Sequence, residues 1–144
     1  MTTLVEAMLE TARLVTPIVE GTATGGSTTT LIDTNRTEPP EFFTGGILFM
    51  TSGDLSGSCY AITGYGENTM TIPTAAAAVS DGDTYAAVPG GYFDKETLKQ
   101  AIFYGLRGYG LIMLVDESLS FVAEQAEYDL PANVSNIRRV EIAE

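Results

Sequence analysis

The side chains that most often perform catalysis or bind metals are scarce in this chain of 144 residues. It has no histidine, so histidine general bases, Ser-His-Asp triads and histidine-ligated metal sites are excluded. Its single cysteine, Cys59, excludes an intrachain disulfide and a cysteine-rich zinc site. Because Cys59 lies in an alternating run from Ser58 to Thr63, we predict a buried structural cysteine rather than a reactive thiol.

Two pairs of carboxylates could bind a hard cation, which prefers oxygen ligands. They are Asp81 with Asp83, and Asp116 with Glu117. Neither pair belongs to the spaced series of ligands that a calcium-binding loop carries, so solvated turns are the simpler interpretation. A hydrolase built from carboxylates far apart in the sequence stays open, but no pattern favours it.

Three glycine-rich strings resemble phosphate-binding loops only in composition. GTATGGSTTT lacks the lysine that a P-loop uses to reach phosphates, and GYGENT and GLRGYG lack the G-x-G-x-x-G spacing. We interpret all three as turns. The sequence therefore offers no candidate catalytic, cofactor-binding or metal-ligating residue, and we expect a protein that is not an enzyme and carries no cofactor.

Tyrosines are the remaining group with binding potential, since exposed aromatic rings can stack on sugars. The chain has seven: Tyr60, Tyr65, Tyr85, Tyr92, Tyr104, Tyr109 and Tyr128. Tyrosines on strands are more often half-buried, with the hydroxyl reaching water or a backbone group. A carbohydrate-binding or receptor-binding module is therefore kept as an alternative of another functional class.

The charge balance indicates which partners the chain can bind rather than which reaction it could catalyse. There are 7 basic and 19 acidic residues, a net charge of −12, and the sequence pI is about 4.1. Binding to nucleic acid or to an anionic membrane relies on Lys and Arg, so neither partner is expected. The apolar run Leu111–Val115 is far shorter than the ~20 residues that span a bilayer. No signal-peptide core is present, and the default compartment is cytoplasmic.

Residues 3–15 are predicted to form an amphipathic helix. Thr3 and Glu6 have the spacing of a capping box, and Pro17 is expected to end the helix. An apolar stripe that includes Met8 and Ala12 must be covered. It can pack on its own domain or dock against a neighbouring subunit, and both possibilities stay open.

The segment from Gly21 to Tyr92 is predicted to be a compact β-module. It holds 12 of the 15 glycines, which we assign to turns between short β-rich runs. Gly21–Ser27 is interpreted as a turn or flexible start, and Phe42-Phe43 as one core ring beside one ring on a rim or interface. Five strands are predicted, at 28–34, 47–52, 58–65, 69–73 and 84–88.

A second helix is predicted near 94–107, capped by Asp94, with a stripe of Leu98, Ala101, Ile102 and Leu106. Apolar or alternating runs at 111–115, 119–123 and 137–142 follow it, and a strand at 137–142 would present an edge for pairing. The expected fold class is α+β, mainly β: a small antiparallel barrel or sandwich with helices. The predicted division is 1–20 (amphipathic helix), 21–92 (β-module) and 93–144 (helix plus strands).

Three stretches of this sequence resemble a β-module of virion structural proteins from tailed bacteriophages. They are GTATGGSTTTLIDT, FFTGGILFMTSGDLSGSCYAITGY and GDTYAAVPGGYF. The helix from Asp94 and the stretch from Ala126 to Ile142 fit as well, so the resemblance covers roughly residues 21 to 142. It implies no catalytic residue.

The resemblance implies a structural, non-enzymatic virion protein, assembled in the host cytoplasm. Head–tail neck adaptor is the leading hypothesis, and a capsid decoration or fibre-base protein is the alternative. Its partners would be portal, neck, tail or capsid subunits, and copies of itself in a homo-oligomer. Copies this acidic repel one another, so apolar or hydrogen-bonded contacts would have to hold such an oligomer together.

Overall fold

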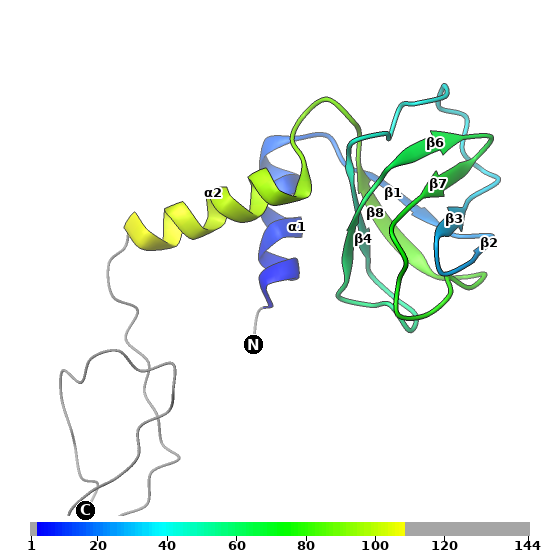
Figure 1. Cartoon of the computed structure of the whole chain (residues 1–144), viewed down its shortest axis with the longest axis horizontal. Coiled ribbons are helices and arrows are strands. Elements are labelled where there is room, and N and C mark those ends of the chain that lie inside the picture. Colours follow the sequence, from blue (N-terminus) through cyan, green and yellow to red (C-terminus); the bar gives the residue numbers. More distant parts are fainter. Residues whose placement is uncertain (1–2, 109–144) are drawn as a thin grey trace, which may run out of the picture. The chain divides into compact units, whose positions relative to one another are not determined.

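A computed structural model of the chain describes residues 3–108. In this range helix α1 (Leu4–Val15) precedes a β-rich region of eight strands, and helix α2 (Lys95–Gly108) follows it (Figure 1). The predicted α+β class, mainly β, is confirmed. The strands proposed for 111–115, 119–123 and 137–142 lie outside the described residues, as do Tyr109, Tyr128 and the pair Asp116 and Glu117.

The strands form two four-stranded sheets in which every neighbouring pair is antiparallel. The first sheet has the order β1 (Val19–Thr22), β8 (Thr84–Val88), β4 (Ile47–Met50), β5 (Cys59–Ala61). The second has the order β2 (Gly25–Gly26), β3 (Thr30–Ile32), β7 (Thr69–Thr71), β6 (Gly64–Gly66). In the first sheet Leu48 lies opposite Ala87 on one side and Tyr60 on the other, which fixes its register.

The two central strands of the first sheet, β4 and β8, are covered on both faces. Alternate residues, Leu48 and Met50, join one core cluster with Leu31, Tyr65 and Met70 of the second sheet. Their neighbours join another cluster, together with residues of both helices: Ile47, Phe49, Ala86 and Val88. A strand buried on both faces needs apolar residues throughout, which explains the uninterrupted runs ILFM and YAAV.

Helix α1 begins as its sequence predicts, and the structure shows what covers part of its apolar stripe. Thr3 and Glu6 form the capping box: the Thr3 backbone N–H donates to the Glu6 carboxylate at 2.7 Å, and the Glu6 N–H donates to the Thr3 hydroxyl at 3.2 Å. Met8 and Ala12 are buried against the first sheet, so this part of the stripe packs on its own domain. Leu14 remains exposed at the end of the helix.

Helix α2 is covered over only part of its length. Asp94 caps it by accepting a hydrogen bond from the Thr97 N–H at 2.7 Å, as predicted. Leu98 is buried and Ile102 packs partly against the cluster between helices and sheet. Ala101 and Leu106 are exposed, so the predicted stripe is covered only near the start of the helix.

Strand 84–88 was predicted with its observed bounds, but one other strand prediction was wrong and two strands were not predicted. The single strand proposed for 58–65 is two strands, because the chain crosses between sheets at Ile62 and Thr63. The Ile62 N–H donates to Gly46 in one direction, and the Thr63 N–H donates to Thr71 in the other. The prediction also missed β1 and β2, so five predicted strands became eight in the described range.

Candidate functional site

The most concentrated polar chemistry in the described residues is a buried cluster of Asp33, Arg36 and Tyr85. The Tyr85 hydroxyl donates to Asp33 Oδ2 at 2.7 Å. Arg36 Nε lies 3.0 Å from Asp33 Oδ2 and 2.8 Å from the Tyr85 hydroxyl oxygen. A second Arg36 nitrogen donates to the backbone carbonyl of Glu20. We call these three side chains the inter-sheet latch.

Local backbone geometry positions the latch. Asp33 follows strand β3 and its Oδ1 accepts the backbone N–H of Asn35 at 3.0 Å, while the Arg36 N–H donates to the Asp33 carbonyl at 3.1 Å. This tight turn returns the guanidinium of Arg36 over its own carboxylate partner. Gly21 of β1 leaves the necessary room, since a Cβ there would collide with the Arg36 guanidinium.

The electrostatics of the latch favour one protonation state. Burial alone would raise the pKa of Asp33, but hydrogen bonds from Tyr85, the Asn35 N–H and Arg36 outweigh it, and the pKa lies below its ordinary value. Burial raises the pKa of Tyr85, and its hydrogen bond to Asp33 raises it further. At neutral pH the carboxylate is therefore ionised and the phenol is protonated.

The latch connects the two sheets. Asp33 follows β3 of the second sheet, whereas Tyr85 lies on β8 and the Glu20 carbonyl on β1 of the first. Both Asp33 oxygens and the Tyr85 hydroxyl are hydrogen-bonded within the protein. With its donors and acceptors already satisfied, the cluster is suited to holding the sheets together.

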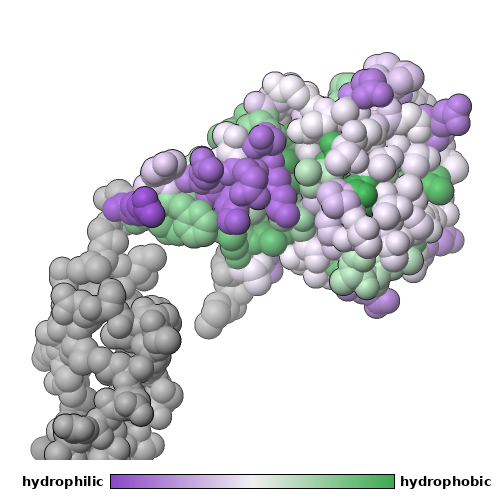
Figure 2. All heavy atoms as spheres, in the orientation of Figure 1, coloured by the Kyte–Doolittle hydropathy of each residue, from purple (hydrophilic) through white to green (hydrophobic). Residues whose placement is uncertain are grey.

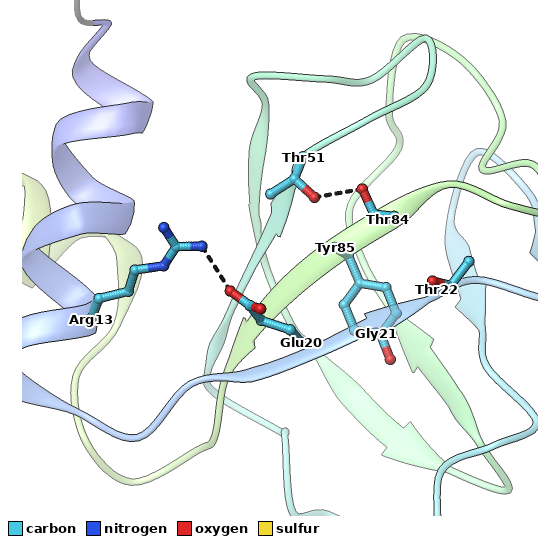
Figure 3. Close-up of a pocket in the computed structure, with 7 residues that line it drawn as sticks. All are labelled: Arg13, Glu20, Gly21, Thr22, Thr51, Thr84 and Tyr85. Carbon is cyan, nitrogen blue, oxygen red and sulfur yellow. Dashed lines mark hydrogen bonds and ion pairs between the residues drawn. The ribbon is translucent and has the colours of Figure 1, made fainter.

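A polar depression of about 480 Å³ lies between α1, β1 and β8 (Figure 3). Arg13 of α1 contacts Glu20 of β1 at 2.7 Å across it, and the hydroxyls of Thr51 and Thr84 share a hydrogen bond of 2.8 Å. Arg13 also pairs with Glu10 at 2.8 Å. The charged side chains that line the depression are paired with each other, and Thr22, Thr51, Thr84 and Tyr85 supply its other polar side chains.

A second groove of about 410 Å³ lies between α1, strand β5 and the start of α2. Apolar side chains from α1 and β5 line it: Leu4, Val5, Met8, Cys59 and Tyr60. Lys95 and Lys99 of α2 complete its lining, and Lys95 Nζ donates to the Cys59 carbonyl at 2.9 Å. We call this feature the lysine groove.

Cys59 is 8% exposed, which confirms that it is buried. Burial raises the pKa of its thiol, although nearby Lys95 opposes the rise. A protonated thiol is a weak nucleophile, so Cys59 is suited to packing rather than to covalent chemistry.

Hydrophobic side chains gather along one side of α2, with hydrophilic ones on the opposite side (Figure 2). Phe103 and Leu106 are 46% and 42% exposed, and Tyr104 is exposed beside them. Large apolar side chains grouped in this way mark surfaces that contact other molecules. We call Phe103, Tyr104 and Leu106 the α2 apolar face.

Other residues singled out in the sequence are dispersed. Phe43 is in the core and Phe42 is partly exposed, as predicted, with the two rings edge to face at 4.9 Å. The pair Asp81 and Asp83 does not converge: Asp83 is buried and accepts the Ser80 N–H at 2.9 Å, whereas Asp81 is exposed. Among residues 3–108 no group of three or more His, Cys, Asp and Glu side chains is placed to hold a metal ion.

The tyrosines do not form one surface. Tyr65 and Tyr85 are buried in the core between the sheets, so neither could stack on a sugar, while Tyr92 and Tyr104 are exposed. Sequence reasoning missed the latch altogether. The (i, i+3) spacing of Asp33 and Arg36, the only basic residue between 21 and 92, was the available signal.

Comparison with known proteins adds no relative: no family model, no curated protein and no solved structure matches this chain. Neither described helix has the length and apolar character needed to cross a membrane.

Proposed function

We propose that this chain is a structural, non-enzymatic subunit of a tailed-phage particle. Its place would be the head–tail neck, where it would act as an adaptor that assembles with copies of itself and with portal, tail or capsid subunits. The alternative within the same class is a capsid decoration or fibre-base protein. The sequence resemblance to virion β-modules motivates the proposal.

The exposure of the α2 apolar face is the observation that supports a role in assembly. Phe103 and Leu106 lie about half exposed, and the cluster between helices and sheet already buries Leu98 of the same helix. Burying apolar area releases about 25 cal/mol per Å², so covering these side chains stabilises a contact. Many copies that each add a modest contact can together form a stable assembly.

The arrangement of the strands supports a sandwich rather than a barrel as the architecture of the β-module. Each sheet has two edge strands, β1 and β5 in one and β2 and β6 in the other. Side chains from both sheets share one core cluster, and the latch bridges the sheets on one side. A rigid module of this kind would hold α2 in a fixed orientation for assembly.

The test is the solution mass of the purified full chain, measured by native mass spectrometry and light scattering across a concentration series. We expect an oligomer whose population falls sharply in the double variant Phe103→Ser/Leu106→Ser. The control Gln100→Ser, at an exposed polar position of the same helix, should leave the mass unchanged. A wild-type chain that stays monomeric would contradict self-assembly through this face.

Labelling of assembled particles separates the two virion roles. A tag on the chain should give signal at a single vertex if the chain is a neck adaptor. Signal spread over the whole shell would instead assign it to capsid decoration.

A further inference from the structure

Strand β5 lies at an edge of the first sheet, and no other strand of residues 3–108 pairs with its outer side. Its inner side pairs with β4, where the Met50 N–H donates to the Ser58 carbonyl and the Ile62 N–H donates to the Gly46 carbonyl, each at 2.9 Å. The backbone N–H and C=O groups of successive residues point to opposite sides of a strand, so those of Cys59 and Ala61 point away from β4. Within residues 3–108, strand β5 pairs only with β4, and the Cys59 carbonyl accepts a hydrogen bond from Lys95 Nζ at 2.9 Å.

The lysine groove adjoins this edge on the helix side of the first sheet. Cys59 belongs to the cluster between sheet and helices, together with Met8, and the groove wall continues to Leu4 and Val5 of α1. A strand added beside β5 would place every second side chain over this apolar wall, because side chains two residues apart share one face of a sheet.

The charged side chains of the lysine groove indicate what kind of segment it would bind. Arg13 and Arg36 are each paired with two carboxylates at 2.7 to 3.4 Å. In the lysine groove the only ion pair within the described residues is the loose contact of Lys99 with Glu96 at 3.8 Å, and Lys95 bonds a carbonyl instead. In a chain of net charge −12, these two partly buried ammonium groups form a local positive site that complements carboxylates.

We propose that the lysine groove and the β5 edge bind an extended acidic segment of a partner protein, which adds to the first sheet as a fifth strand. Hydrogen bonds to the Cys59 backbone N–H and to the backbone of Ala61 would supply affinity, as in other complexes formed by strand addition, while the Cys59 carbonyl keeps its bond from Lys95. On the helix-facing side, an aliphatic residue packs on the apolar wall and flanking carboxylates reach Lys95 and Lys99. This inference depends on neither a virion role nor the α2 apolar face.

The probe is a synthetic peptide, acetyl-Thr-Glu-Thr-Val-Thr-Glu-Thr-amide, carrying a fluorescein label. Its alternate positions present two carboxylates and one valine to the groove. We expect saturable binding to the full chain by fluorescence polarisation. We expect no binding when both glutamates become lysine, or when valine becomes proline, which interrupts strand pairing. In the complex the Ala61 amide should become protected from hydrogen exchange.

Two variants keep the test specific. Lys99→Glu reverses one charge without removing the Lys95 bond to Cys59, and should weaken binding by at least about fivefold, the equivalent of one exposed ion pair. The control Arg13→Met removes one positive charge from the polar depression and should change affinity by less than about twofold, because Arg13 does not line the lysine groove.

Equal binding of the glutamate and lysine peptides, or binding unaffected by Lys99→Glu, would overturn the proposal. So would absence of binding by the wild-type chain. A further outcome is that the chain does not bind the peptide and that Lys99→Glu abolishes its self-association. In that case a second copy of the chain pairs with the β5 edge, and the assignment to a partner protein is wrong.

Discussion

At the scale of single residues, two tyrosines of one core differ in what their hydroxyls do. Tyr85 donates to Asp33 at 2.7 Å and accepts from Arg36 at 2.8 Å. Tyr65 is 4% exposed and its ring packs edge to face on Phe43, but among the described residues its hydroxyl has no hydrogen-bond partner. Both tyrosines are therefore buried, but only the Tyr85 hydroxyl forms hydrogen bonds within the described residues.

Removing these hydroxyls one at a time tests that difference. Tyr85→Phe should lower the free energy of unfolding by about 1–3 kcal/mol, because it leaves buried Asp33 and partly buried Arg36 with one hydrogen-bond partner fewer. Tyr65→Phe should change it by less than about 0.5 kcal/mol or raise it. Urea unfolding followed by circular dichroism measures both. Equal losses in the two variants would contradict a structural role for the latch.

Asp33 gives the fold a predictable sensitivity to acid. Its pKa is lower in the folded chain than the 3.8 of an ordinary aspartate, so its ionised form stabilises the fold above about pH 4. That contribution disappears as pH falls through the folded pKa. The difference in the free energy of unfolding between wild type and Asp33→Asn should be largest at pH 7 and should decrease steadily below pH 4. Melting curves across this range measure it, and a constant difference would contradict the assignment.

The burial of single residues could be predicted from the sequence, but the pairing within the latch could not. Burial of Cys59 and Phe43 was predictable because both lie in strongly patterned runs. The pairing of Asp33 with Tyr85 was not, since 52 residues separate them and only the packing of two sheets brings them together. Gly21 was interpreted as part of a turn, whereas its lack of a side chain makes room for Arg36.

At the scale of elements, helix α1 carries apolar side chains that differ sharply in exposure. Met8 is 1% exposed and contacts the cluster between sheet and helices, whereas Leu14 is 87% exposed. Helix stability in a protein comes mainly from packing of such a face. The two positions therefore separate packing within the domain from contacts with other molecules.

Alanine at each position provides the comparison. Met8→Ala should destabilise the full chain by about 2–5 kcal/mol through the lost contacts and the cavity left behind. Leu14→Ala should change stability by less than about 0.5 kcal/mol. Thermal unfolding of both variants at matched concentration is the measurement. A large loss from Leu14→Ala would mean that another surface covers this residue in solution.

Helices and strands that are specified by residue types in a short window were predictable. Strands that form only because a neighbouring strand pairs with them were not. The capping box of α1, the Asp94 cap of α2 and the bounds of β8 follow from residue types in short windows. Strands β1 and β2 include three glycines, which depress strand propensity, and exist because β8 and β3 pair with them. The break at Ile62 and Thr63 likewise depends on which sheet each half joins.

At the scale of the whole described region, residues 3–108 combine a rigid interior with selected open surfaces. Two core clusters and the latch fix the sheets and the start of both helices. The α2 apolar face, the β5 edge and the lysine groove remain uncovered by other described residues. Phe103, Leu106 and Lys99 lie outside both core clusters, so these surface positions can be altered without unfolding the chain.

The net charge of −12 gives the last prediction, on assembly. If the α2 apolar face holds copies together, contact must overcome repulsion between acidic surfaces. Raising NaCl from about 0.01 M to 0.15 M shortens the screening length from about 30 Å to about 8 Å, so self-association should strengthen. Sedimentation velocity at fixed protein concentration measures the change, with Phe103→Ser/Leu106→Ser as the control that stays dissociated. Association that weakens with salt would show that ion pairs, rather than apolar contacts, hold the copies together.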